Sequence, residues 1–414
     1  MIRRAAPLPA ALPAAALLAL LRAAAGAGAG PRVVAVGDVH GAYDALRDIL
    51  LATGLIDAGG RWAGGDAVLV QTGDLLDRGA DALRVAWWLM RLQEEAPAAG
   101  GRVIVLLGNH EVMNLMGDLR YVTPEMVAPL ADGDSEKRRS AECKERSAIL
   151  RRAARDLGER PPLAGEVRKA CVEEIPPGLI EYVAALRPEE PLGRWLRRLP
   201  AVARVGEVVF VHGGLSAEMA AEGVDAINRQ VRSELATFDA WRDWLVREEK
   251  MVASASLTAM ARAVRVEVAI REKAAAEAEE GDEDAVRVEG AAAPDLDRFF
   301  EISDSLLLRQ DGPLWFRGYH DWTEEEGRAA LPGILERLAA RHLVVGHTPR
   351  KTGRIESRFG HRVFLIDTGM LADYYGGAPA ALQFADGRVK AVYLDEQVVL
   401  LEAPAEQQMV SEPR

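Results

Sequence analysis

Residues 33–41 read VVAVGDVHG, an apolar run that predicts a β-strand and ends in a turn carrying an acid and a histidine. The next segment, 42–52 (AYDALRDILLA), has the apolar spacing of a helix. The same order returns at 66–72 (DAVLVQT) and 80–93 (ADALRVAWWLMRLQ), and a third strand is expected at 102–107 (RVIVLL). Strands that alternate with helices predict an α/β fold whose parallel sheet is covered on both faces.

Six short motifs carry the chemistry of the sequence. They are Gly37-Asp38-Val39-His40-Gly41, Gly73-Asp74-Leu75-Leu76-Asp77-Arg78-Gly79, Gly108-Asn109-His110-Glu111, His212-Gly213-Gly214, Gly346-His347-Thr348 and Asp367-Thr368-Gly369. The first three each follow an expected strand, so their polar residues would emerge at strand carboxyl ends, where open α/β sheets place their ligand crevices. Together the six motifs have the residue types of a two-metal phosphoesterase site.

A phosphate ester resists hydrolysis because its negative charge repels nucleophiles. Two divalent ions about 3.5 to 4 Å apart neutralise that charge and hold a bridging hydroxide in line for attack. Such a pair needs one carboxylate between the ions, and Asp74 is the candidate. The other candidate ligands are Asp38 and His40 for one ion, and Asn109, His212 and His347 for the second.

Each motif has an ordinary structural alternative when it is taken alone. Gly-Asp-x-His-Gly can be a turn with a capping Asp, and Asp-Arg-Gly at 77–79 can be a helix start with a surface pair. Their occurrence together, in order and each after an apolar run, favours the site. The remaining polar and aromatic candidates match no ligand position: His320, His342 and His361 are expected to be structural or surface histidines, Trp87-Trp88 to be core packing, and Tyr374-Tyr375 to line the substrate cleft.

The rest of the chain is organised around these motifs. Residues 30–402 are expected to form one catalytic domain, with a helical cap insertion at 113–200 and a tail at 403–414. A second helical region, 217–298, contains the acidic stretch AAAEAEEGDED at 274–284, which predicts a solvated helix end or mobile loop. The later strands, at 208–211, 343–345, 363–366, 381–384 and 389–394, are expected to supply a second sheet that closes the core.

Residues 1–29 differ from all that follows. The segment begins Met-Ile-Arg-Arg, continues with a short Ala/Leu stretch and ends in small residues, which is the pattern of a secretory signal peptide. Its apolar run is too short to span a bilayer. Export to a periplasm or to the outside is therefore favoured, without stable membrane association after removal of the segment. Targeting to an organelle, or a cytoplasmic chain with an Ala-rich tail, is the alternative.

Composition limits the partners. The formal charge is −12, and it includes Arg3, Arg4 and Arg22, so the part after residue 29 is still more acidic. A general affinity for nucleic acid is not expected of such a chain. Cys143 and Cys171 are the only cysteines, and neither has a Cys or His at zinc-like spacing. Two buried thiols, or a disulfide in an exported chain, are both compatible with the sequence.

The motifs resemble those of the phosphoprotein phosphatase branch of the calcineurin-like metallophosphoesterases, whose pattern is GDxHG, GDxxDRG, GNHE, a later HGG and a final His. Within that branch the stretches 106–114 (LLGNHEVMN) with 119–121 (LRY), 312–318 (GPLWFRG) and 345–349 (VGHTP) resemble the Shewanella-like protein phosphatases. The resemblance covers residues 33–395. Leu107 departs from the Arg that the common serine/threonine phosphatases of this branch carry before GNHE.

The resemblance implies a fold of two packed central β-sheets flanked by helices, and it implies a role for each matching residue. Asp38, His40 and Asp74 would hold one metal, and Asp74, Asn109, His212 and His347 the other. His110 would be the general acid, and Asp77 would orient it and raise its pKa. Arg78, Arg317 and Asn109 would bind the substrate phosphate, the two arginines by bidentate hydrogen bonds. The implied cofactors are two divalent ions, with manganese favoured and iron or zinc as alternatives.

The expected function is therefore hydrolysis of phosphoprotein or phosphopeptide esters by a hydroxide that bridges two metals. The preference for tyrosine phosphate over serine or threonine phosphate rests on the resemblance alone. Hydrolysis of dinucleoside polyphosphates is a second possibility, although Glu111 stands where Asp is expected in those relatives. A non-catalytic phosphate-binding module is a third, but it would be expected to lack ligands, and none is missing here.

Overall fold

The computed structural model describes residues 30–280 and 294–402, and it contains two β-sheets. The expected signal peptide at 1–29, the tail at 403–414 and the end of the acidic stretch lie outside the described residues. The first sheet has the strand order β11-β10-β9-β1-β2-β3. Its strands are β1 (Val33–Val36), β2 (Val68–Gln71), β3 (Arg102–Val105), β9 (Ala380–Ala385), β10 (Arg388–Tyr393) and β11 (Gln397–Leu401).

The second sheet has the order β4-β5-β6-β8-β7. Its strands are β4 (Val202–Val205), β5 (Val208–Val211), β6 (His342–Val345), β7 (Glu356–Arg358) and β8 (Val363–Leu365). In each sheet the three motif-bearing strands are neighbours and run parallel: β1, β2 and β3 in the first, and β5, β6 and β8 in the second. The carboxyl ends of parallel strands meet at one edge of a sheet, so each sheet offers one edge to the motifs.

The last two predicted strands were assigned to the wrong sheet. The segments 381–384 and 389–394 were expected in the second sheet, but β9 and β10 extend the first, where β9 pairs antiparallel with β1. The free edge of β1 explains this, because an apolar strand left unpaired exposes a full row of backbone donors and acceptors. The short strands β4, β7 and β11 were not predicted.

The two sheets pack face to face, as expected. Alternate residues of the first sheet, such as Val33, Ala35 and Val68, share one buried cluster with Phe210 and Val344 of the second. The intervening residues point the opposite way, because side chains alternate across a strand. There Val34, Val36 and Leu69 pack with helices α2 (Tyr43–Ala52) and α3 (Ala82–Glu95). Within 82–95 Trp88 is buried as predicted, but Trp87 is exposed, which corrects the expectation for that residue.

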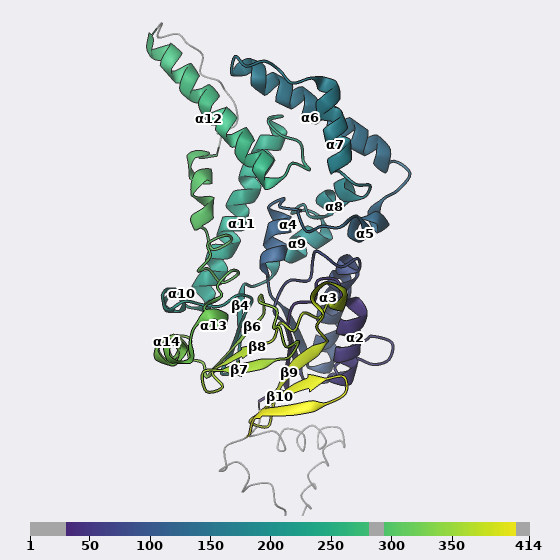
Figure 1. Ribbon diagram of the computed structural model, residues 1–414, viewed down its shortest axis with the longest axis vertical. Coiled ribbons are helices and arrows are strands. Elements are labelled where there is room, and N and C mark those ends of the chain that lie inside the picture. The colour runs from purple at the N-terminus through teal and green to yellow at the C-terminus, as the bar shows by residue number, and fades with distance from the viewer. Residues whose placement is uncertain (1–29, 281–293, 403–414) are drawn as a thin grey trace, which may run out of the picture.

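Two groups of helices rise from the strand ends on the same side of the sheets (Figure 1). We call α6 (Ser135–Asp156) and α7 (Ala164–Glu174) the first arm, and α11 (Val224–Arg247) and α12 (Leu257–Glu280) the second arm. Short helices connect the first arm to the sheets: α4 (Asn109–Leu115), α5 (Pro124–Val127), α8 (Leu179–Ala185) and α9 (Pro191–Arg198). Cys143 of α6 and Cys171 of α7 form a disulfide, which settles the alternative that the sequence left open.

The remaining helices lie beside the sheets. They are α10 (Ala217–Glu222), α13 (Gly318–Asp321), α14 (Glu324–Arg337) and α15 (Ala372–Tyr375). Elsewhere, 3₁₀ segments occur at Ala96–Ala99, at Ala128–Leu130 and, against the second arm, at Asp297–Asp304. α14 begins with a capping box in which Thr323 and Glu326 exchange hydrogen bonds, a strong N-terminal signal. Among the described residues, no helix combines the length and the apolar character needed to cross a bilayer.

Candidate active site

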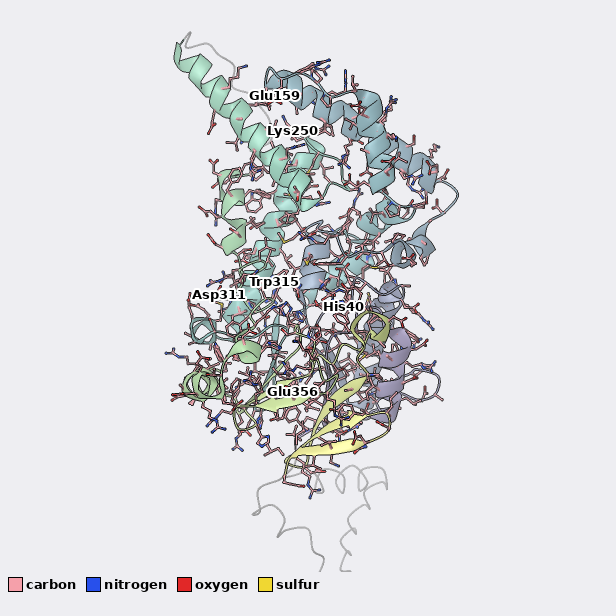
Figure 2. The ribbon with its side chains drawn as sticks, viewed as in Figure 1. His40, Glu159, Lys250, Asp311, Trp315 and Glu356 are labelled. Atoms are coloured by element: carbon pink, nitrogen blue, oxygen red, sulfur yellow. A yellow bond between two sulfur atoms is a disulfide. The ribbon has the colours of Figure 1, made fainter. Side chains whose placement is uncertain are left out.

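Seven polar side chains converge from the strand ends of both sheets. Asp38 and His40 follow β1, Asp74 follows β2 and Asn109 follows β3 in the first sheet; His212 follows β5, His347 follows β6 and Asp367 follows β8 in the second. All seven are buried. His40 lies between the strand ends below and the helices above, with Trp315 across from it (Figure 2). The six predicted metal ligands are thus in one place.

The backbone at these strand ends is strained. His40, Asp74, Asp77, Arg78 and His347 all have positive φ angles, between 45° and 71°. A side chain in this left-handed region costs about 1 to 3 kcal/mol, so surrounding contacts must hold it there. The strain lies within the predicted motifs, where it turns consecutive side chains toward one centre.

The carboxylate of Glu111 helps to hold the strained backbone of the site in place. Its buried carboxylate accepts backbone N–H bonds from Gly108, Asp74 and Leu75 at 2.8 Å and from Leu76 at 3.1 Å. It therefore ties the loop after β2 to the loop after β3. Glycine is required at Gly108 because an added Cβ would lie 2.2 Å from Asp74 Oδ1. This role of Glu111 was not predicted from the sequence, where the residue served only to distinguish related families.

Asp74 occupies the centre of the site. Its Oδ2 lies 3.6 Å from His40 Nε2 and 3.9 Å from His110 Nε2, and its Oδ1 lies 3.3 Å from His212 Nε2. Two sets of side chains could each hold a metal, His40–Asp74–His110 and Asp74–His212–His347, and within each set the ligand atoms lie within 4.8 Å of one another. Asp74 is the member that the two sets share, as a bridging carboxylate must be.

The ring nitrogens of this centre are arranged as metal ligands. His212 Nδ1 lies 2.9 Å from the carbonyl of Thr72, and His40 Nδ1 lies 2.9 Å from the carbonyl of Leu76. Because a carbonyl only accepts, each Nδ1 carries the proton and each Nε2 offers a lone pair. His212 Nε2 then faces Asn109 Oδ1 at 2.8 Å and His347 Nδ1 at 3.1 Å. Such a concentration of acceptors fits a cation between them.

The pKa shifts of the buried histidines and carboxylates also fit a metal-binding site. Burial lowers the pKa of His40 to about 3. Burial, together with the neighbouring His212 and Arg317, lowers the pKa of His347 well below its usual range. Both are therefore neutral at pH 7, as imidazole ligands must be. Burial, followed by the charges of Asp367 and Asp74, raises the pKa of Asp38, since three carboxylates share one buried space. Bound divalent cations would relieve this repulsion.

Asp38 lies at the second-sheet side of the site and not in the set of His40. Its two carboxylate oxygens accept the backbone N–H of His347, each at 3.1 Å. The nearby Asp367 is also buried, and burial raises its pKa to about 6. The Asp-Thr-Gly motif was recognisable in the sequence without a role for Asp367, although its position after a buried strand was the available signal. One oxygen of Asp367, Oδ2, is buried and has no hydrogen-bond partner among the described residues.

His110 and Asp77 form the predicted pair. His110 Nδ1 lies 2.5 Å from Asp77 Oδ2, and both side chains are buried. Burial acts to lower the pKa of His110, but the negative charges of Asp74 and Asp77 and the hydrogen bond to Asp77 outweigh it, so this pKa is raised. His110 Nε2 is left facing Asp74 and the pocket. That geometry suits proton delivery, although His110 also belongs to one candidate metal set.

A pocket of about 540 Å³ opens over this centre. Polar side chains line it on the site side: Asp74, Arg78, Asn109, His110, Arg317 and His347. Aromatic and apolar side chains also line it, among them Met113, Tyr121, Leu257, Trp315, Tyr374 and Tyr375, together with the polar Asp118, Arg120 and Gln310. Tyr374 and Tyr375 therefore line the cleft, as predicted, whereas His320, His342 and His361 are not among its lining residues.

The two predicted phosphate-binding arginines approach from different sides. The Arg78 guanidinium contacts His40 Nε2 and the Tyr375 hydroxyl, and it lies 5.2 Å from the ring centres of Tyr121, Tyr374 and Tyr375. Its Nε is buried without a partner. Arg317 bonds the hydroxyl of Thr348 at 2.7 Å. Both guanidinium groups thus border the space above Asp74.

Comparison with known proteins supports the interpretation of the motifs as those of a phosphoesterase. Residues 31–258 match the calcineurin-like phosphoesterase family. Shewanella-like protein phosphatase 2 of Arabidopsis thaliana is 37% identical over 212 residues, which are 51% of this chain and 53% of that protein, so the match spans about half the length of that relative. Shewanella-like protein phosphatase 1 of Plasmodium berghei is 25% identical over 368 residues, 88% of this chain and 74% of that protein.

Solved structures are similar to this chain over a longer span than the Arabidopsis relative is. A cold-active protein tyrosine phosphatase superposes with a TM-score of 0.55 at 25% identity, covering 90% of this chain and 79% of that one. A cold-active protein-tyrosine phosphatase of a psychrophilic Shewanella species gives a TM-score of 0.54 at the same identity. With its strand-end motifs, two packed sheets and family match over more than half its length, this chain belongs to the calcineurin-like phosphoesterase family.

Proposed function

We propose that this protein is a two-metal phosphomonoesterase that acts on phosphoprotein or phosphopeptide esters and favours tyrosine phosphate. The observation that carries the proposal is the position of Asp74 between His40 on one side and His212 and His347 on the other, with the His110–Asp77 pair facing the same pocket. When bound, the two ions would supply positive charge for the phosphoryl oxygens and a hydroxide nucleophile. Manganese is the favoured ion, with iron or zinc as alternatives.

The protein's own residues have distinct roles in this proposal. Asp38, His40, Asp74, Asn109, His212 and His347 hold the ions. Arg78 and Arg317 hold the phosphate, since a guanidinium fork matches phosphate oxygens. His110 gives a proton to the leaving oxygen, and Asp77 keeps the ring oriented and charged. The general acid contributes most where the leaving group is least able to depart as an anion.

The aromatic wall of the pocket supports the preference for tyrosine phosphate. Tyr121, Tyr374 and Tyr375 surround Arg78 at equal distances of 5.2 Å, and Trp315 lies 5.9 Å from His347 on the other side. A phenyl leaving group would pack against these rings, whereas the short side chain of phosphoserine would leave them bare. The similar solved structures named as protein tyrosine phosphatases agree with this preference.

The disulfide between Cys143 and Cys171 supports export or targeting to an oxidising compartment as part of the proposal, because such bonds are rare in the cytosol. The segment 1–29 that would direct export lies outside the described residues. Proteolytic removal of that segment in the native host would support export, and a retained segment would oppose it.

The function is tested by assaying manganese-loaded protein against tyrosine and serine/threonine phosphopeptides, phosphosugars and dinucleoside polyphosphates. We expect the highest kcat/KM on tyrosine phosphopeptides. Asp74→Asn, prepared in the same way, controls for contaminating phosphatases. Faster hydrolysis of dinucleoside polyphosphates, or equal rates in the control preparation, would refute the proposal.

A further inference from the structure

The His110–Asp77 pair continues into a buried chain of hydrogen bonds that ends in the helical cap insertion. Asn114 Nδ2 donates to Asp77 Oδ1 at 2.9 Å, and the Tyr182 hydroxyl donates to Asn114 Oδ1 at 2.8 Å. All four side chains are buried, and Tyr182 and Asp77 are fully so. Tyr182 belongs to α8, which lies near α4 in the fold (Figure 1). Tyr182 thus reaches the proposed acid through two intermediates, Asn114 and Asp77.

Asn114 controls which oxygen of Asp77 faces His110. It lies one helical turn after His110 on α4, so the two residues share a face. Its Nδ2 donates both to Asp77 Oδ1 and to the carbonyl of His110, at 2.9 and 2.8 Å. These bonds occupy Oδ1 and leave Oδ2 for His110 Nδ1. The carboxylate is therefore held in one orientation.

Tyr182 in turn fixes the amide of Asn114. An asparagine amide can turn over, and the inverted form would point Oδ1 at the carboxylate of Asp77, where two acceptors repel. A hydroxyl that donates to Oδ1 favours the observed orientation. Burial raises the pKa of Tyr182 well above its usual value, and the nearby charges of Asp77 and Glu111 raise it further, so the hydroxyl keeps its proton. Tyr182 is thus a dependable donor.

We propose that Tyr182 and Asn114 are positioning residues that keep the Asp77–His110 pair aimed at the leaving group, so that the cap insertion takes part in catalysis as well as covering the site. This inference rests on the proposed function, because it presumes that His110 is the acid. Its distinctive consequence is that Tyr182 affects turnover only through His110.

The first test is Tyr182→Phe in the full, metal-loaded protein. Loss of one buried hydrogen bond to the positioning amide should lower kcat on phosphoserine peptides about threefold to tenfold. KM and bound metal should not change, and the loss should be smaller on p-nitrophenyl phosphate, whose leaving group needs little protonation. Tyr393→Phe is the matched control, because its buried hydroxyl accepts the backbone N–H of Ile355 and Tyr393 does not line the pocket. It should leave kcat unchanged.

The second test repeats Tyr182→Phe in a His110→Asn background. If Tyr182 acts through His110, the second change costs no further activity, since effects on one functional unit are not additive. Equal losses in both backgrounds would overturn the inference while leaving the proposed function intact. A His110→Asn variant with normal turnover on phosphoserine peptides would overturn both. Asn114→Ala provides the same test at the intermediate residue, and Tyr182→Phe should add no loss to it.

Discussion

The strand-end site and the first arm use charged residues in opposite ways. In the site, Asp38, His40 and Asp74 are buried, and the backbone around them is strained. In the first arm, charges lie on the helix surfaces in neighbouring pairs, such as Lys169 with Glu173 on α7, whose side chains are 79% and 68% exposed. Water screens such pairs, and they contribute little to stability.

This difference shows where the chemistry of the molecule resides. A buried charge needs a specific partner, so its neighbours are fixed residue by residue. An exposed charge needs only water and can be replaced. The arms and the cap should therefore affect catalysis only through the few side chains that they extend toward the site, such as Tyr121, Tyr182 and Leu257.

Asp74→Asn should have the largest effect on turnover. A neutral amide cannot offset the repulsion between two ions or offer each of them an anionic oxygen, so the folded protein should hold fewer than two metals and turnover of p-nitrophenyl phosphate should fall to background. Metal analysis per chain, together with steady-state kinetics, checks this. Asp57→Asn is the control, because Asp57 accepts only the backbone N–H groups of its own turn. Two bound ions and a near-normal rate in the Asp74 variant would remove Asp74 from the bridging position.

His110→Asn should give the next largest effect. It should retain its metals but lose about 10²- to 10⁴-fold in turnover on alkyl phosphates such as phosphoserine peptides. The loss should shrink through phosphotyrosine to nitrophenyl phosphate, as the leaving-group pKa falls. His320→Asn is a matched control, because His320 also pairs with an acid, Asp321 at 2.8 Å, but lies outside the pocket. Equal losses across the series would mean that His110 positions the phosphate or acts as a ligand.

The sequence predicted the strand-end residues because their motifs are local. Asp38 and His40, or Asp74 and Asp77, lie within four residues of each other, so one turn fixes both. Asn114 carried a weaker signal, its place one helical turn after His110. Tyr182 carried none, since its contact with Asn114 joins residues 68 positions apart and depends on how the cap folds back.

The sheet assignment of β9 and β10 failed for a related reason. Alternation and turn residues predict that a segment is a strand, but not which free edge it will join. Here β9 joins β1, where Leu382 and Phe384 stand opposite Ala35 and Val33. Such pairing across about 350 residues has no local signature.

Arg78→Lys should have a moderate effect. Lysine keeps the charge but not the planar fork, so KM for phosphopeptides should rise about tenfold with a smaller change in kcat. Arg84→Lys is the control, because Arg84 also stacks on a tyrosine, 3.6 Å from the ring centre of Tyr43, but outside the pocket. An unchanged KM in the Arg78 variant would assign phosphate binding to Arg317 and the ions alone.

Removal of the disulfide should have the smallest effect on turnover, because the bond lies in the first arm and not in the strand-end site. The bond between Cys143 and Cys171 joins residues 28 positions apart within the first arm, and the arm's contribution to the site passes through α8 and the loop at Tyr121. Cys143→Ser with Cys171→Ser should lower the free energy of unfolding by about 3 to 4 kcal/mol, the loop-entropy value for a loop of this length. Turnover on p-nitrophenyl phosphate should change less than twofold. Urea unfolding of the oxidised protein and of the double variant, with kinetics on both, measures the two quantities together. A large loss of turnover in the double variant at low urea concentration, with its metal content intact, would show that the arm holds Tyr182 and Asn114 in place. The first arm could then not be replaced without loss of catalysis.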